Sequence, residues 1–173
     1  MLRPPEGEDV PSITAACQDS EIARWTRVPS PYTLAHATAW VEAKPEENAV
    51  SLLVLDAATE QLLGAAGLVA IEREQARAAV GFWTAAWARR RGVAAGAIRL
   101  LAPWAFEALA RLQAFAHEAN HGSQRTLERV GFTREGILRS YGEVKGERWD
   151  MAVFSLLAEE LPQGKPSASR LSE

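Results

Sequence analysis

The hydrophobic pattern of this chain changes from strand-like to helix-like near its centre, and this change constrains the fold most. Three short apolar runs, at 50–55, 62–71 and 78–83, are separated by polar turns, which predicts an antiparallel meander of three strands. From Ala94 to Leu112, apolar residues recur at the i, i+3, i+4, i+7 spacing of an amphipathic helix. The centre of the chain is therefore expected to form three strands, a loop and a long helix.

Helical patterns precede the meander, and shorter alternating segments follow the long helix. Asp9 marks the start of a first helix, Thr33 fits the N-cap of a second, and Gly131 is a typical C-terminal stop for a third. The chain order predicts an α+β fold, in which a mixed, mostly antiparallel central sheet is flanked by helices. The expected elements are helices at 10–18, 34–41 and 122–130, and further strands at 113–118, 136–141 and 149–157.

Length and composition indicate an ordinary soluble protein. The 173 residues fit a single domain, expected at 1–161, and the segment 162–173 has the composition of a disordered tail. A net charge of −3 argues against a general nucleic-acid binder, and the single Cys17 excludes an internal disulfide and a cysteine-based zinc site. No apolar run reaches the roughly 18 residues of a membrane span. The N-terminus lacks the apolar core of a signal peptide, so a cytoplasmic protein is expected.

A loop rich in arginine and small residues lies between the third strand and the long helix. It reads Arg89-Arg90-Arg91-Gly92-Val93-Ala94-Ala95-Gly96. Small residues let the backbone approach a ligand, and a helix N-terminus offers unpaired N–H groups with a partial positive charge. Together these features predict a site for a diphosphate, to which the arginines add charge. The alternative interpretation is a solvated basic turn. The loop lacks the Gly-Lys-Ser/Thr ending of a P-loop and the glycine spacing of a dinucleotide site.

With a second segment farther along the chain, this loop resembles the GNAT acetyltransferase superfamily. The family's loop reads Gln/Arg-x-x-Gly-x-Gly/Ala, and the run from Arg89 to Ala94 fits it. Within the superfamily, the resemblance is to the RimJ/RimL branch, the ribosomal-protein N-terminal alanine acetyltransferases, and it covers about residues 2–158. The matching positions are Gly81-Phe82-Trp83, Asn120, Ser123, Leu127, Gly131-Phe132, 135–139, Asp150 and Phe154.

Two positions depart from the pattern of that branch. An acidic residue often found just before the Gly-Tyr-Trp strand end is Ala79 here, and an acidic residue common in the first turn after the loop is Gly96. The first departure means that no catalytic carboxylate carries over simply from the resemblance.

The resemblance implies direct acetyl transfer from acetyl-CoA to a primary amine, either a protein N-terminus or a small molecule, in a ternary complex. It implies that the strand end before the loop pairs with the pantetheine arm and stabilises the thioester oxyanion through a backbone N–H. It also implies that the Asn120 amide fixes the pantetheine. The implied coenzyme-binding residues are Phe82, Trp83, Thr84, Arg89, Arg90, Arg91, Gly92, Val93, Ala94, Ala95, Asn120 and Ser123.

The acid and the base of this reaction have separate candidates. Ser123 is the candidate acid for the leaving thiolate, since a free thiol has a pKa of about 8.5, and Tyr141 is the second candidate. Glu72 is the candidate base for the acceptor amine, with Glu74 beside it. Structural alternatives stay open: Asn120 as a turn residue, Ser123 as a helix N-cap, and Glu72 as a solvated hairpin carboxylate.

Four residues are candidates for the acceptor site. Trp25 and Tyr32 belong to the proline-rich linker between the first two helices, where the GNAT family admits its acceptor. Tyr141 is a further candidate, and Asp150 either binds a cationic amine or is structural. His117 and His121 have no cysteine or carboxylate at ligand spacing, so no metal is expected.

Two other classes of function compete with the enzyme. One is a non-catalytic acyl-CoA-binding or regulatory module with the same fold, which the absence of an obvious base keeps open. The other is an RNA-binding protein that uses the arginine cluster, which the lack of a basic face and of interleaved aromatic residues argues against. No nucleic-acid or membrane partner is therefore expected, whereas the resemblance is compatible with a homodimer.

Overall fold

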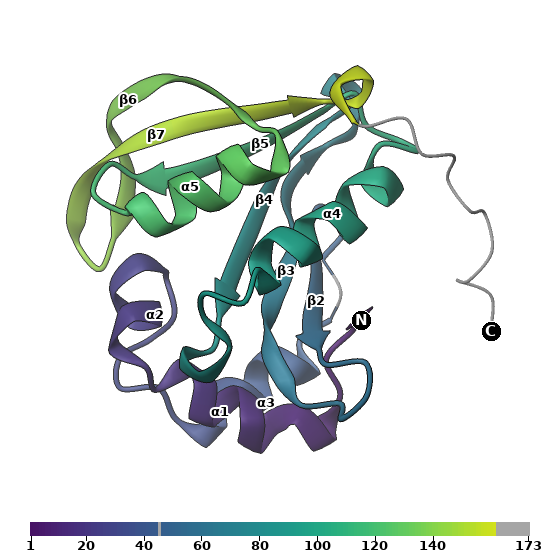
Figure 1. Cartoon of the computed structure of the whole chain (residues 1–173). Coiled ribbons are helices and arrows are strands. Elements are labelled where there is room, and N and C mark those ends of the chain that lie inside the picture. Colours follow the sequence, from purple (N-terminus) through teal and green to yellow (C-terminus); the bar gives the residue numbers. More distant parts are fainter. Residues whose placement is uncertain (45, 162–173) are drawn as a thin grey trace.

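One seven-stranded sheet with helices on both faces forms the framework of the protein (Figure 1). The structure, a computed structural model, describes residues 1–44 and 46–161. The strand order is β1-β2-β3-β4-β5-β7-β6, and the neighbours are antiparallel except β4 and β5. The predicted mixed, mostly antiparallel sheet is confirmed. The strands are β1 Leu2–Arg3, β2 Val50–Leu55, β3 Leu62–Glu72, β4 Arg77–Thr84, β5 Arg111–His117, β6 Thr133–Val144 and β7 Glu147–Leu157; the helices are α1 Val10–Cys17, α2 Ser20–Trp25, α3 Leu34–Glu42, α4 Val93–Ala105 and α5 His121–Val130.

The structure differs from the predicted elements in three places. Helix α2 and the short strand β1 are absent from the sequence prediction, and α4 ends at Ala105 rather than near Leu112. Pro103 lies inside α4, two residues before this end, and a proline removes a backbone hydrogen bond from a helix. Leu112 is fully buried although it lies on β5. Apolar residues of this stretch such as Ile98 and Leu112 therefore belong to one core but not to one helix. The predicted tail at 162–173 lies outside the described residues.

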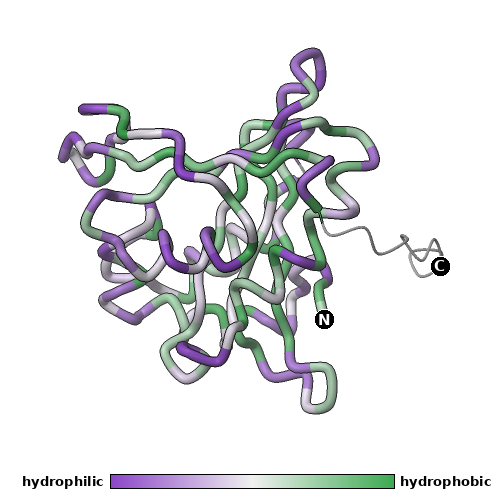
Figure 2. The backbone as a smooth tube through the Cα atoms, turned by 45° about the horizontal axis from the view of Figure 1, so that its top comes forward, coloured by the Kyte–Doolittle hydropathy of each residue, from purple (hydrophilic) through white to green (hydrophobic). Residues whose placement is uncertain are grey.

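Two apolar layers hold the helices against the sheet. On one face, Ile98 and Leu101 of α4 and Leu127 of α5 pack with Phe154 of β7. On the other face, α1 and α3 contribute to a buried layer with β2 and β3, in which Ile13 is fully buried. Each such side chain contributes about 1.5–3 kcal/mol when it is fully buried. Figure 2 shows the apolar colour along the central strands and the hydrophilic colour at many turns.

The parallel pair β4 and β5 is joined over only a short stretch. Its register runs from Arg77 opposite Arg111 to Ala79 opposite Gln113. Beyond this point β4 stays paired with β3 as far as Thr84, and β5 stays paired with β7 as far as His117. The two strands therefore diverge, as Figure 1 shows, and the edge of β4 from 80 to 84 has no strand partner on the β5 side within the described residues.

Candidate functional site

A cleft of about 800 Å³ opens where β4 and β5 separate. Four parts of the chain form its walls: the end of β4, the loop and first turn of α4, the start of α5, and α2. Most residues predicted to bind the coenzyme come together here, although they lie on separate elements. Those lining the cleft are Phe82, Trp83, Thr84, Arg89, Arg90, Gly92, Val93, Ala94, Ala95, Asn120 and Ser123, together with the predicted acceptor residue Trp25.

The first turn of α4 presents backbone donors to the cleft. Gly92 is the N-cap residue, with φ 76° and ψ 10°, and as a glycine it has no side chain with which to cap the helix. The first bond from an amide of the helix back to the cap joins the Gly96 N–H to the Gly92 carbonyl at 2.9 Å. The N–H groups of 93–95 precede it and lack intrahelical acceptors, and the first turn carries no acidic residue. This end of the helix is therefore suited to an anion.

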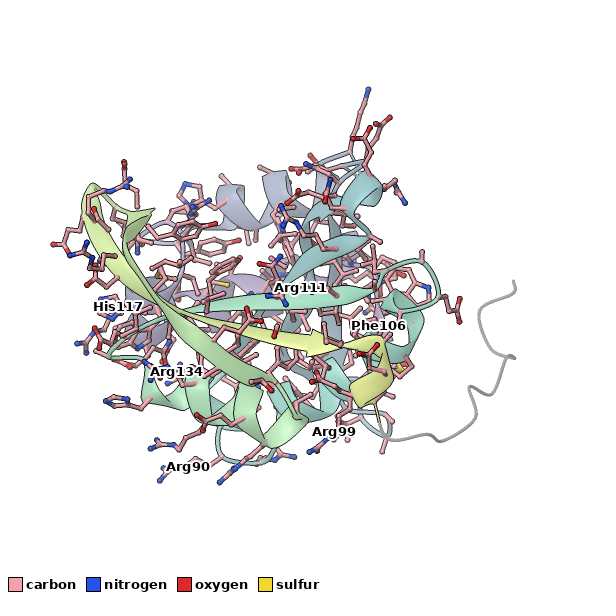
Figure 3. All side chains as sticks on the ribbon, turned by 90° about the horizontal axis from the view of Figure 1, so that it is seen from above. Arg90, Arg99, Phe106, Arg111, His117 and Arg134 are labelled. Atoms are coloured by element: carbon pink, nitrogen blue, oxygen red, sulfur yellow. The ribbon has the colours of Figure 1, made fainter. Side chains whose placement is uncertain are left out.

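Three arginines line the cleft beside these donors, in addition to Arg89. Arg90 comes from the loop and extends on the side of the sheet that α5 covers (Figure 3). Arg125 and Arg129 come from α5 and were missed by the sequence prediction. Their spacing of four residues, which also places Gly122 and Thr126 on the same helical face, could have revealed them. Several cationic groups therefore surround the helix end that is suited to an anion.

The other two arginines of the predicted cluster do not add free charge to the cleft. Arg91 is exposed and is not a lining residue. Arg89 lines the cleft, but its guanidinium forms an ion pair with Asp19 of the chain just before α2. The sequence pattern treated 89–91 as one basic cluster, whereas the backbone turns at Arg90, with φ 60°, and separates the three side chains.

Asn120 and Ser123 stand at the start of α5, at the cleft. The Asn120 Oδ1 accepts a hydrogen bond from the Ser123 N–H at 3.1 Å, so Asn120 is the N-cap of the helix. The structural alternative assigned this role to Ser123, and the cap is instead Asn120. The Ser123 side chain lines the cleft and remains a candidate for the acid.

An aromatic cluster backs the α2 side of the cleft. The Trp25 ring lies 5.3 Å from the His117 ring and 6.2 Å from the Trp149 ring, between ring centroids. His117 and Trp149 are 4.5 Å apart in an edge-to-face arrangement. The His117 Nδ1 accepts a hydrogen bond from the Ala119 N–H at 3.0 Å, so the neutral ring carries its proton on Nε2. Trp25 is thus held against β5 and β7 rather than projecting freely.

Two predicted residues belong to a second hollow, of about 380 Å³, on another part of the sheet. Glu72 forms an ion pair with Arg77 at 2.7 Å, across the β3–β4 hairpin. Tyr141 stacks on Phe115, with 5.2 Å between ring centroids. Neither side chain lines the cleft that holds the other predicted residues. The structure therefore does not bring the predicted base or the second candidate acid to that cleft.

Two predicted acceptor residues have structural positions instead. Tyr32 is only 7% exposed and packs in the layer between α1, α3 and the sheet. Burial, with a smaller contribution from Cys17, raises the pKa of Tyr32 to about 12. The Asp150 Oδ1 accepts a hydrogen bond from the Ser140 N–H at 2.6 Å, where the pairing of β6 with β7 is irregular. Asp150 therefore holds a bulge in β6, the structural alternative at this position.

The described part of the chain has neither a candidate metal site nor a candidate membrane-spanning helix. Across 1–44 and 46–161, no three His, Cys, Asp or Glu side chains come together in a way that would hold a metal ion. None of the helices in those ranges has both the length and the apolar character that crossing a membrane requires.

The chain is similar to known acetyltransferases in a family model, in sequence and in structure. Residues 1–133 match the family model described as "Acetyltransferase (GNAT) domain". The chain is 27% identical over 168 residues to the uncharacterized N-acetyltransferase p20 of Bacillus licheniformis, covering 92% of this chain and 93% of p20. It is also similar to the crystal structure of a GCN5-related N-acetyltransferase from Brucella melitensis, with 27% identity, a TM-score of 0.81, and coverage of 93% of this chain and 76% of that one.

A third similarity concerns the fold alone. The structure of Mycobacterium smegmatis RimJ in complex with CoA-disulfide has a TM-score of 0.82 and 22% identity to this chain. The match covers 94% of this chain and 83% of RimJ.

Proposed function

This chain belongs to the acetyltransferase (GNAT) domain family, and on that premise we propose that it transfers the acetyl group of acetyl-CoA to a primary amine. One observation carries the proposal: the N-terminus of α4, whose N-cap residue is a glycine, opens onto a cleft between two diverging strands. Such a cleft offers donors for a diphosphate at one end and a free strand edge along which an amide-containing arm can pair.

The residues of the cleft fit the parts of coenzyme A. The N–H groups of 93–95 would bind the diphosphate, with Arg90, Arg125 and Arg129 adding charge-assisted hydrogen bonds. The free edge of β4 from 80 to 84 would pair with the amides of the pantetheine arm. The cleft, at about 800 Å³, lies within the range of 300–1,000 Å³ usual for small-molecule and cofactor sites.

Acetyl-CoA would supply the activated acetyl group, and the chain would supply orientation and proton transfer. A backbone N–H within 82–84 would stabilise the charge that develops on the thioester oxygen. The Ser123 hydroxyl would give its proton to the departing sulfur. Glu21 of α2 is the acidic side chain among the described residues that line the cleft, and it would take the proton of the amine. We therefore propose Glu21, rather than Glu72, as the base.

Within the family, we propose that the chain is of the RimJ/RimL type. The support is the set of matching positions in the sequence, among which Phe82, Trp83, Asn120 and Ser123 line one cleft. On this basis the acceptor is a protein N-terminus or a small amine that enters beside Trp25. The Trp25 ring, packed against His117 and Trp149, gives this side of the cleft an aromatic wall.

Binding and turnover are tested separately. Calorimetry with acetyl-CoA measures the donor site, and release of free thiol measures transfer to a panel of amines: a short alanyl peptide, a short seryl peptide and spermidine. Micromolar binding with thiol release and a mass increase of one acetyl group on the amine is the expected result. Binding without transfer to any amine would favour the non-catalytic module, and absence of binding would refute the proposed donor site.

A further inference from the structure

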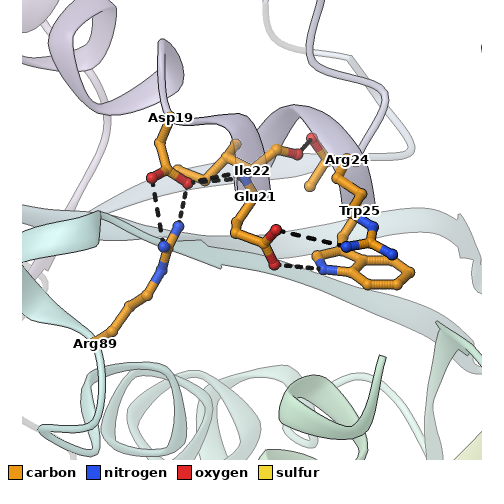
Figure 4. A network of polar contacts seen from close by, with 7 residues as sticks. Asp19, Glu21, Ile22, Arg24, Trp25 and Arg89 are labelled. Carbon is orange, nitrogen blue, oxygen red and sulfur yellow. Dashed lines mark hydrogen bonds and ion pairs between the residues drawn. The ribbon is translucent and has the colours of Figure 1, made fainter. Parts of the chain in front are cut away.

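Arg89 connects the loop before α4 to the start of α2, at the wall of the cleft. Its Nη1 lies 3.4 Å from the Asp19 Oδ2, and its Nη2 contacts the Asp19 Oδ1, so the two groups face each other side by side (Figure 4). The Arg89 side chain is 34% exposed and that of Asp19 is 20% exposed. The ion pair is therefore partly shielded from water, which strengthens it relative to a fully exposed pair.

Asp19 also begins α2. Its Oδ1 accepts hydrogen bonds from the backbone N–H groups of Glu21 at 3.1 Å and Ile22 at 3.0 Å, which makes it the N-cap. Burial raises the pKa of this carboxyl, but the hydrogen bonds from Arg89 and from the Ile22 N–H outweigh it, so the net pKa lies below its usual value. Asp19 is therefore ionised at neutral pH and joins the start of α2 to the loop before α4.

Helix α2 depends on such tertiary contacts. It has only six residues, and isolated helices shorter than about 12–15 residues are marginal in water. Ile22 is the buried residue of the helix. The far end is held by the contact of Trp25 with His117 and Trp149, and by a hydrogen bond from the Lys145 Nζ to the Ala23 carbonyl. The ion pair with Arg89 fixes the near end.

The same short helix carries two residues of the acceptor side of the cleft. Glu21 and Trp25 are one turn apart, and the Glu21 Oε2 accepts a hydrogen bond from the Trp25 Nε1 at 3.1 Å. Figure 4 shows this pair and the Arg89–Asp19 pair on the same side of α2. A shift at the start of the helix would therefore move both side chains.

We infer that Arg89 is a positioning residue, which holds the acceptor wall through Asp19, rather than a ligand of the coenzyme's phosphates. The inference rests on the proposed function for the identity of the cleft. It gives two neighbouring arginines different roles: Arg90 lines the cleft, where it would bind acetyl-CoA, whereas Arg89 forms an ion pair with the start of α2. Loss of the ion pair would weaken acceptor binding and leave donor binding nearly intact.

Four variants of the full chain test this assignment, of which Arg89→Lys is the conservative one. Arg89→Ala removes the cation, and Asp19→Ser removes the carboxylate while keeping a residue that caps helices well. Arg90→Ala is the matched control, because it removes the neighbouring arginine and leaves the Arg89–Asp19 ion pair in place. Calorimetry with acetyl-CoA, hydrogen exchange of the amides in 20–26, and the KM and kcat of the best amine from the panel are measured for each.

The expected results differ between the variants. Arg89→Ala and Asp19→Ser keep the acetyl-CoA Kd within about twofold, speed amide exchange in 20–26 about tenfold, and raise the KM for the amine more than they lower kcat. Arg90→Ala weakens acetyl-CoA about tenfold and leaves exchange in α2 unchanged, as the loss of about one charge-assisted hydrogen bond predicts. Arg89→Lys restores slow exchange, since it keeps the positive charge.

Two outcomes would overturn the inference. The first is that Arg89→Ala weakens acetyl-CoA as much as Arg90→Ala while Asp19→Ser has no effect, which would make Arg89 a phosphate ligand. The second is unchanged exchange in 20–26 in both Arg89→Ala and Asp19→Ser, which would show that α2 does not depend on the ion pair. Failure of the wild-type protein to bind acetyl-CoA would refute the proposed function instead, and the exchange measurement would still decide whether the ion pair holds α2.

Discussion

Replacement of Gly92 by glutamate is expected to weaken acetyl-CoA binding through its charge, and to destabilise the protein only through its backbone conformation. Gly92 immediately precedes α4 and lines the cleft together with the residues of the first helical turn. A carboxylate here would face the coenzyme's diphosphate across the same helix end. Gly92→Ala is the matched control, because it introduces the same backbone restriction without the charge.

The structure assigns the two effects to separate causes. With φ 76°, the residue is in the left-handed region, which costs a non-glycine residue about 1–2 kcal/mol. An added Cβ would meet no heavy atom within 4 Å, so no clash adds to this strain. Both variants should therefore lower the melting temperature by about 2–8 °C. Repulsion between unit charges about 4 Å apart amounts to about 1–4 kcal/mol near a protein surface, which is about a 5- to 1,000-fold loss of affinity for Gly92→Glu alone.

Calorimetry at two salt concentrations identifies the cause. Screening shortens the Debye length from about 10 Å at 0.1 M salt to about 3 Å at 1 M. The affinity defect of Gly92→Glu relative to Gly92→Ala should therefore shrink at high salt. If the two variants bind acetyl-CoA equally at low salt, the N-terminus of α4 does not face the diphosphate and the proposed donor site is wrong.

Three further predictions concern the acid, the sheet and the pH dependence of stability. Ser123→Ala should lower the rate of thiol release about 10- to 100-fold with little change in acetyl-CoA affinity, and an unchanged rate would place the acid elsewhere. Gly67→Ala should cost more than 3 kcal/mol in denaturant unfolding, because its Cβ would lie 2.0 Å from the Val50 carbonyl oxygen; a loss under 1 kcal/mol would contradict this geometry. The hydrogen bond from Arg3 lowers the pKa of Asp9, so its stabilisation is complete above the unfolded value of about 3.9 and is lost as the pH falls through the lower folded value. Asp9→Asn should flatten this acid limb in unfolding experiments, and an unchanged limb would assign it to other groups.

The sequence predicts the elements whose pattern is local and regular. The meander at 50–83 and the stop at Gly131 have the predicted positions because apolar runs between polar turns and a left-handed glycine determine them within a few residues. Helix α2 escapes prediction because six residues carry too short a pattern. Its start depends on the Asp19 carboxylate, whose partner Arg89 is distant in the sequence.

The predictions for the site divide in the same way, between residues placed by local sequence and residues placed by tertiary contacts. Residues on one continuous segment, such as Gly92 and Ala94, lie where the loop pattern suggested. Glu72 lies on the strand that pairs with β4, but pairing alone does not say which end of the strand the cleft occupies. Glu21 was overlooked because the relation between α2 and the cleft is entirely tertiary.

The position of the cleft follows from how the two middle strands are held. A parallel pair requires a crossover connection, and here α4 provides it between β4 and β5. The N-terminus of α4 consequently lies near the carboxyl end of β4, the region where open sheets usually bind ligands. Each strand is hydrogen-bonded along its other edge, β4 to β3 and β5 to β7. Closing the gap between β4 and β5 would therefore break antiparallel hydrogen bonds on both sides. The cleft is thus a property of the backbone, and substitutions such as Arg89→Ala or Gly92→Glu should change what it binds without removing it.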